Sequence, residues 1–197
     1  LGDRLGLYKA MAGRGAMDVD ALAEATGVRR RYLQEWLNAQ AASGFVAYDA
    51  ASQTYALSDE AAMVFAQEDS PVFLGGAYDL LQSMFLDVDK VQRAFQTGSG
   101  LGWHEHSACL FSGTERFFRA GYNTHLIPEW IPALDGVQAR LEKGARVADV
   151  GCGFGTSTIV MAKAFPKSTF VGYDYHEPSV DAARRAAKEA GVDGRVS

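Results

Sequence analysis

The chain has few cysteines and prolines and no long apolar stretch. Its two cysteines, Cys109 and Cys152, lie in different segments, which excludes a disulfide framework and makes reduced thiols the expectation. No uninterrupted apolar run approaches the roughly 20 residues of a membrane helix. The start, Leu1-Gly-Asp-Arg, lacks the basic and apolar regions of a signal peptide. We therefore expect a cytoplasmic protein that does not bind membranes.

Positive charge is also scarce. The formal net charge is -5 at pH 7, which gives the chain no general attraction for nucleic acid or for anionic membranes. Apolar residues make up 48% of the 197 residues, enough for a packed core. These features favour a globular protein whose partner is a small molecule.

Residues 1–66 have the pattern of a winged-helix-like domain. Helices are expected over residues 5–11, 18–26 and 30–42. Asp18 can cap the second helix, and Gly27 suits the left-handed position after its end. Two β-prone runs, 45–48 and 54–57, flank a turn over 49–53 and predict a hairpin.

Residues 67–135 are predicted to be a helical connector rich in aromatic side chains. Ser70 and Pro71 are expected to open its first helix, and the glycines of 98–102 interrupt the helical pattern. Ser112 and Glu115 have the spacing of a capping box, and Pro128 is expected to start a further short helix.

From residue 136 to 197 strands alternate with helices, which predicts an α/β fold with a parallel sheet. The strands are expected over 146–150 and 169–174, with a third beginning at 195. The helices are expected over 137–143, 157–165 and 179–190. Because parallel strands deliver their carboxyl ends to the same edge, the loop after Val150 should lie beside Asp174.

The loop itself, Asp149-Val-Gly-Cys-Gly-Phe-Gly155, has glycines at alternate positions. Gly151, Gly153 and Gly155 let the backbone turn sharply and approach a ligand, and Asp174 can accept hydrogen bonds from both hydroxyls of a ribose. A dinucleotide fingerprint needs a third glycine where Thr156 or Thr158 stands, so the spacing argues against a nicotinamide or flavin cofactor.

The set from Arg146 to Asp174 resembles the first motifs of class I S-adenosylmethionine-dependent methyltransferases. With the winged-helix start and the aromatic connector, the layout is similar to bacterial small-molecule methyltransferases that carry an N-terminal winged-helix-like domain. The resemblance implies S-adenosyl-L-methionine as cofactor and methyl transfer to a small-molecule acceptor. It also implies that a C-terminal part of the Rossmann-like domain is missing. Because the strands present would then expose open edges and uncovered apolar faces, we expect that residues 1–197 alone would not bind cofactor or remain monomeric.

The resemblance assigns cofactor roles by position. The backbone near Gly151 and Gly153 would hold the methionine portion, with Asp149 near its amino group. Asp174 matches the ribose-binding acid, and Tyr175 stands where such enzymes place a side chain against the adenine. The full candidate set adds residues that support the loop or neighbour the cofactor: Cys152, Gly155, Thr156 and Tyr122.

Several alternatives stay open at the level of sequence. Arg29, Arg30 and Arg31 stand where a DNA-reading helix would want basic residues, which allows a transcription regulator with a nucleotide-fold ligand sensor. However, residues 1–66 have a charge balance of -2, whereas DNA readers show a basic footprint. A dimerisation or scaffold role for this domain, in a homodimer, is therefore preferred.

The sequence names no catalytic base and no metal site. The histidines are the only near-neutral titrating groups, and none is assigned as base: His104, His106, His125 and His176. The segment Trp103-His-Glu-His106 with Cys109 contains metal-ligand types, but no second cluster has matching spacing. This segment is expected to cover a ligand pocket or simply to pack.

Overall fold

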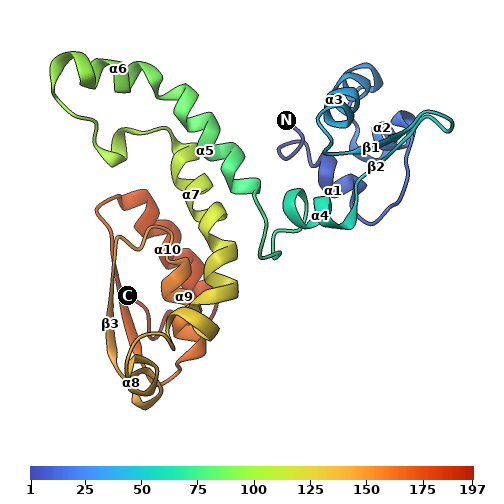
Figure 1. Cartoon of the computed structure of the whole chain (residues 1–197). Coiled ribbons are helices and arrows are strands. Elements are labelled where there is room, and N and C mark those ends of the chain that lie inside the picture. Colours follow the sequence, from blue (N-terminus) through green and yellow to red (C-terminus); the bar gives the residue numbers. More distant parts are fainter. The chain divides into compact units, whose positions relative to one another are not determined.

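The computed structural model describes all residues from 1 to 197 and divides the chain into two compact units. The first unit is Leu1–Gly75 and the second is Gly76–Ser197 (Figure 1). The sequence placed boundaries at 66/67 and 135/136, whereas in the structure the connector residues from 76 onwards belong to the same unit as the strands that follow.

The first unit contains four helices, whose bounds are α1 (Leu7–Met11), α2 (Val19–Thr26), α3 (Arg30–Ala42) and α4 (Asp59–Phe65). The predicted ends of the second helix are confirmed. The Asp18 carboxylate accepts a hydrogen bond from the Ala21 N–H at 2.8 Å, and Gly27 adopts the left-handed conformation with φ 69°. Ser58 caps α4 in the same way, by accepting from the Ala61 N–H at 3.1 Å.

The predicted hairpin is present as β1 (Ala47–Asp49) and β2 (Thr54–Ala56), paired antiparallel. Met17 extends this sheet through two backbone hydrogen bonds with Tyr55, at 2.7 and 2.8 Å. The core of the unit collects side chains from all four helices and from the hairpin and its flanks: Leu7, Met11, Leu22, Leu33, Leu37, Val46, Tyr55, Leu57 and Ala62. The first three helices and the hairpin form the winged-helix arrangement that the sequence predicted, and α4 follows the hairpin.

The second unit begins with helices α5 (Gly75–Leu86) and α6 (Val88–Thr97), followed by the short turn η1 (Trp103–Glu105). The prediction that Ser70 and Pro71 open the first helix is wrong, because the helix begins at Gly75. The chain from Ser70 to Leu74 forms a turn instead, in which the Phe73 N–H donates to the Ser70 carbonyl at 3.1 Å. The Leu74 N–H donates to the Val64 carbonyl at 2.9 Å. Both amides thus form hydrogen bonds within the first unit and not within a helix.

The capping box predicted from Ser112 and Glu115 is also wrong. Helix α7 runs from Ala108 to Gly121, so both residues lie inside it. The helix starts after Ser107, whose N–H donates to Asp87 at 2.9 and 3.2 Å. At the start of α7 the hydrogen-bond acceptor is therefore the Asp87 carboxylate, which is distant in sequence. The capping-box prediction had assumed a side chain within the first turn.

Pro128 does not start a helix. It lies inside η2 (Tyr122–Trp130), a π-helical segment that continues directly from α7. Proline has no N–H, and its ring clashes with the carbonyl four residues earlier in an α-helix, which favours the wider π turn. The Ile131 N–H accordingly donates to the Leu126 carbonyl, five residues back, at 2.9 Å.

The strands and helices at the end of the chain follow the predicted alternation. Their bounds are α8 (Val137–Lys143), β3 (Arg146–Val150), α9 (Thr156–Ala164), β4 (Thr169–Tyr173) and α10 (Glu177–Glu189). β3 and β4 pair in parallel, with Asp149 opposite Gly172 and Val150 opposite Tyr173. Residues 195–197 form a parallel bridge with the other side of β4, through hydrogen bonds between Phe170 and both Arg195 and Ser197.

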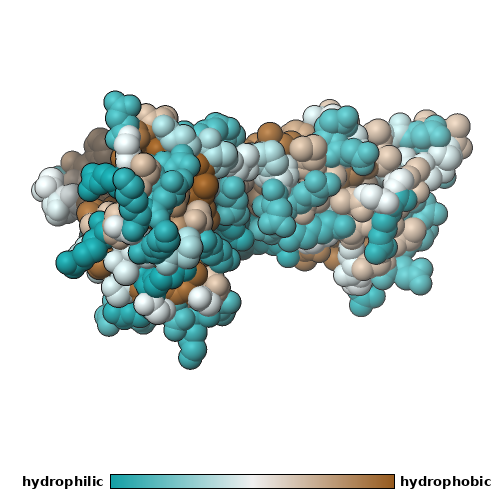
Figure 2. Space-filling view, turned by 90° about the horizontal axis from the view of Figure 1, so that it is seen from below, coloured by the Kyte–Doolittle hydropathy of each residue, from teal (hydrophilic) through white to brown (hydrophobic).

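Helix α9 is central to the second unit, because it contacts β4, α10, α7 and η2 (Figure 1). Phe170 on β4 is almost fully buried, and the core around it includes Leu126, Ile131, Leu141, Ile159, Ala162, Phe165, Ala187 and Val192. On the visible surface, apolar residues are interspersed among hydrophilic ones (Figure 2). No helix has the length and apolar character that a membrane crossing requires.

Candidate active site

The glycine loop lies where the two strands end. Because β3 and β4 are parallel and in register, Val150 and Tyr173 end at the same edge of the sheet. The N–H groups of Gly151 and Cys152 both donate to the Tyr173 carbonyl, at 2.7 and 3.1 Å. The loop is therefore fastened to the end of the neighbouring strand, as the sequence predicted.

The three glycines of the loop all adopt positive φ angles, but they serve different purposes. Gly151 has φ 77° and Gly153 has φ 53°, and a Cβ at either position would meet nothing within 4 Å. Their open sides leave room for a ligand to approach the backbone. Gly155 has φ 78°, and a Cβ there would lie 3.0 Å from Ala183 on α10, so this glycine permits close packing of α9 and α10.

Asp174 follows β4 and holds the loop with its carboxylate. Oδ2 accepts a hydrogen bond from the Gly153 N–H at 2.9 Å, and Oδ1 accepts one from the His176 N–H at 2.9 Å. Each carboxylate oxygen has more than one lone pair, so both can accept a further bond from a hydroxyl. The arrangement suits a ligand with two neighbouring hydroxyl groups.

Asp149 has a different environment. Its Oδ2 accepts hydrogen bonds from the Ser157 hydroxyl at 2.8 Å and from the Thr158 hydroxyl at 2.6 Å. These bonds tie β3 to the first turn of α9, and Thr158 is fully buried. The Asp149 side chain lines neither of the two cavities at this edge of the sheet.

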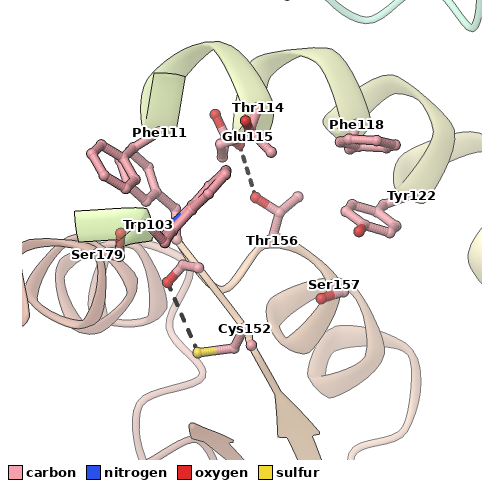
Figure 3. A pocket seen from close by; sticks show the side chains of 13 residues that line it. Trp103, Phe111, Thr114, Glu115, Phe118, Tyr122, Cys152, Thr156, Ser157 and Ser179 are labelled. Carbon is pink, nitrogen blue, oxygen red and sulfur yellow. Dashed lines mark hydrogen bonds between the residues drawn. The ribbon is translucent and has the colours of Figure 1, made fainter. Parts of the chain in front are cut away.

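A first cavity lies between the loop and helix α7 (Figure 3). The connector contributes Trp103, Phe111, Thr114, Glu115, Phe118 and Tyr122, and the opposite wall consists of Gly151, Cys152, Gly153, Phe154, Thr156, Ser157 and Ser179. Glu115 bridges the two walls, because its Oε1 accepts a hydrogen bond from the Thr156 hydroxyl at 2.8 Å. The structure thus brings together five of the predicted site residues: Tyr122, Gly151, Cys152, Gly153 and Thr156.

A second cavity, of about 760 Å³, lies beside the first and shares Trp103, Thr114, Gly151 and Gly153 with it. Its volume is within the range of about 300–1,000 Å³ typical of ligand pockets. Asp174 and Tyr175 line it. The Tyr175 side chain is 66% exposed, and its ring meets that of His104 edge-on at 5.8 Å.

Burial and negative charge raise two pKa values in the first cavity. The pKa of the Tyr122 phenol is raised by burial and then by the Asp149 carboxylate. The pKa of the Cys152 thiol is raised by burial and by the charges of Asp149 and Asp174. Both groups are therefore neutral at pH 7, and Cys152 is not an activated nucleophile.

The four histidines do not line the first cavity, and each has a neighbour of its own. His106 Nδ1 lies 3.1 Å from Asp87, and His125 Nδ1 lies 3.0 Å from Glu129. His176 shares a hydrogen bond with Ser179 at 2.7 Å, and its ring stacks on Phe111. No group of three or more His, Cys, Asp or Glu side chains is placed to hold a metal ion.

Sequence reasoning missed Glu115 as part of this site and expected it to cap a helix. The available signal was Arg119, four residues later, because a glutamate and an arginine at that spacing share a helix face. In the structure Arg119 donates to Glu115 at 2.8 and 2.5 Å. From the sequence, the segment of Trp103 was expected to cover a pocket or simply to pack, and Phe111 was not singled out.

Comparison with known families assigns both ends of the chain. Residues 1–67 match a model described as an Rv2258c-like winged HTH domain, and residues 141–197 match a model described as a methyltransferase domain. The chain combines a winged helix-turn-helix domain with a methyltransferase domain. The loop, Asp174 and α9 all belong to the matched part of the methyltransferase domain.

Solved structures and curated relatives agree with this assignment. The chain is similar to mitomycin 7-O-methyltransferase, with a TM-score of 0.67 and 19% identity over 100% of this chain and 58% of that one. A methyltransferase of calicheamicin biosynthesis, in its SAH-bound form, gives a TM-score of 0.57 and 23% identity, again over 100% and 58%. At these identities the likeness is one of fold.

Among curated proteins, the tRNA (guanine-N(7)-)-methyltransferase of Shewanella piezotolerans is 40% identical over 60 residues. That match covers 30% of this chain and 25% of the relative. The chain therefore spans a quarter of this relative and just over half of the solved structures that it resembles.

Proposed function

We propose that the methyltransferase domain binds S-adenosyl-L-methionine and transfers its methyl group to a small-molecule acceptor. The observation that carries the proposal is the edge of the sheet, where Asp174 has acceptor capacity beside the open backbone of Gly151 and Gly153. A donor composed of a nucleoside and an amino acid needs both features. The SAH-bound form of a structural neighbour supports this choice of cofactor.

In this proposal the cofactor extends across the two adjoining cavities, and each cavity binds a different part of it. Asp174 binds the ribose hydroxyls, and Tyr175 packs against the adenine in the second cavity. Gly151 and Gly153 present their backbone to the methionine portion, between the two cavities. The first cavity supplies the wall near the sulfonium: Cys152, Thr156 and Tyr122. Gly155 and Asp149 act indirectly, by holding α9 in place.

S-adenosylmethionine supplies an electrophilic methyl group when bound. The protein has to align the acceptor with that methyl group and to exclude water, and no covalent nucleophile is required. Trp103, Phe111 and Phe118 form an apolar cover suited to excluding water. Their ring faces also attract a cation, as the donor sulfonium is.

A small-molecule acceptor agrees with the charge of the chain. The structural neighbours include a mitomycin 7-O-methyltransferase, whereas the curated relatives are named for tRNA. A net charge of -5 is unfavourable for tRNA, because nucleic-acid binding depends on cations that neutralise phosphates. We therefore favour the small molecule.

The test is to titrate the full-length protein with S-adenosylmethionine, SAH and NAD by calorimetry. We expect the two sulfur nucleosides to bind at micromolar concentration or below and NAD not to bind. Transfer of a labelled methyl group to small hydroxyl compounds and to tRNA then separates the acceptor classes. Tight binding of NAD without binding of either sulfur nucleoside would refute the proposal.

The winged helix-turn-helix domain is proposed to support a homodimer rather than to bind DNA. Arg30 pairs with Asp20 at 2.6 Å, and Arg31 pairs with Glu35, so two of the three candidate arginines already have acidic partners. Light scattering of the full-length protein tests the dimer. A monomer at tens of micromolar would contradict it.

A further inference from the structure

Glu115 is the one residue lining the first cavity that carries a formal charge at neutral pH. It projects from α7, outside the glycine motif, and faces Thr156 across the cavity (Figure 3). Its side chain is only 15% exposed. A carboxylate that is largely removed from water is costly unless cations or hydrogen-bond donors surround it, so its partners need to be identified.

Three hydrogen bonds fix the orientation of this carboxylate. Oε1 accepts from the Thr156 hydroxyl at 2.8 Å and from Arg119 Nε at 2.8 Å. Oε2 accepts from Arg119 Nη2 at 2.5 Å. Because a carboxylate oxygen accepts about two hydrogen bonds, Oε2 keeps capacity for one more donor.

Asp149 does not line this cavity, although its charge acts on Tyr122 and Cys152. Its Oδ2 is occupied by the hydroxyls of Ser157 and Thr158, and its side chain is absent from the cavity wall. The sequence placed the amino group of the donor near Asp149. In the structure the carboxylate that reaches the cavity is that of Glu115.

We propose that Glu115 binds the α-ammonium group of the donor's amino acid portion, and that Thr156 and Arg119 position its carboxylate for this role. The inference rests on the proposed function and deepens it. An ammonium group has three charged N–H donors, one of which can use the remaining acceptor capacity of Oε2. Thr156 and Ser157 at the start of α9 also line the cavity, so the first N–H groups of this helix, which have no partner within it, would be available to the ligand carboxylate.

The experiment compares two ligands on the full-length protein by calorimetry. SAH carries the amino acid portion, whereas 5′-methylthioadenosine has the same nucleoside without it. We expect Glu115→Gln to weaken SAH binding at least tenfold and to change methylthioadenosine binding less than twofold. Glu142→Gln, an exposed glutamate on α8 that bonds only Gln138, is the matched control and should change neither.

A second measurement needs no variant. SAH in which the amino group is replaced by hydrogen should bind the unmodified protein with the same tenfold loss. Equal SAH affinity of Glu115→Gln and the unmodified protein would overturn this inference while leaving the proposed function intact. An equal loss for both ligands would also overturn it, since that pattern indicates a structural role. Failure of the unmodified protein to bind either nucleoside would instead refute the proposed function.

Discussion

At the residue scale, Asp174 combines two tasks that can be separated by substitution. It holds the Gly153 and His176 amides, and we propose that it also binds the ribose. Hydrogen bonds to charged groups contribute about 1.5–3 kcal/mol each, which corresponds to roughly 10- to 100-fold in affinity. We expect Asp174→Ala in the full-length protein to lose SAH affinity by at least this factor, measured by calorimetry.

Asp174→Asn should lose less, because its amide oxygen still accepts one backbone hydrogen bond. Asp135→Ala removes an exposed carboxylate elsewhere in the same unit and is the control. Unchanged SAH affinity in Asp174→Ala would mean that the nucleoside does not lie at this edge of the sheet.

Cys152 provides a second prediction at this scale. Its raised pKa, caused by burial and by Asp149 and Asp174, means that little thiolate is present at pH 7 to 8. Since the thiolate is the reactive form, iodoacetamide should modify Cys152 more slowly than a free cysteine, with a rate that still rises above pH 9. Mass spectrometry in a Cys109→Ser background measures the rate. SAH should slow the reaction further, and rapid modification at pH 7 would contradict the environment described.

At the scale of elements, Asp87 holds the start of α7 from outside the helix. Lys90, the Ser107 hydroxyl and N–H, and His106 surround its carboxylate, and they hold the Asp87 pKa far below its ordinary value of 3.8. A carboxyl with a lowered pKa in the folded state stabilises the protein above pH 3.8, and this contribution disappears as the pH falls towards the lowered value. Asp87→Asn should therefore lower the thermal midpoint at pH 7.

The difference between Asp87→Asn and the unmodified protein should shrink below pH 4, as measured by circular dichroism melting. Asp89→Asn, an exposed residue on the neighbouring α6, is the control and should melt like the unmodified protein. A pH-independent difference would show that the charge of Asp87 is not what holds the helix start.

The crossing of α5 and α7 depends on a glycine on each helix. A Cβ at Gly76 would lie 2.7 Å from the Gly113 carbonyl oxygen and the same distance from Phe117 Cα. Both obstacles are backbone atoms, so the helices would have to separate. We expect Gly76→Ala to lower the free energy of unfolding by about 1–3 kcal/mol in urea titrations. Gly194→Ala, where a Cβ would meet nothing within 4 Å, should have little effect.

The elements also show what sequence can and cannot predict. Two features follow from neighbours close in sequence and were predictable: the cap at Asp18 and the helix end at Gly27. The position of the glycine loop beside Asp174 was also predictable, because it follows from the regular geometry of parallel strands. The start of α7 was not, because its acceptor is Asp87, twenty residues away. The role of Glu115 was not predictable either, because its partner Thr156 is forty-one residues away.

At the scale of the whole molecule, net charge favours the small-molecule acceptor proposed above over a nucleic acid. A net charge of -5, with acidic partners on Arg30 and Arg31, predicts no measurable binding of duplex DNA or tRNA at physiological salt. Fluorescence anisotropy over a range of salt concentrations measures it. Micromolar binding that falls steeply with salt would favour the regulator or the tRNA acceptor instead.

The π-helical segment η2 continues α7, and its side chains contact both the first cavity and the core of the second unit. In an α-helix, residues five apart point about 140° away from each other, given 3.6 residues per turn. Leu126 and Ile131 are five apart, yet both are buried in the same core. The π turn around Pro128 therefore shifts the phase of the helix. Tyr122 packs against the same core and also lines the first cavity, so deleting one residue from the π-helical segment would misalign the core side chains with those on the cavity.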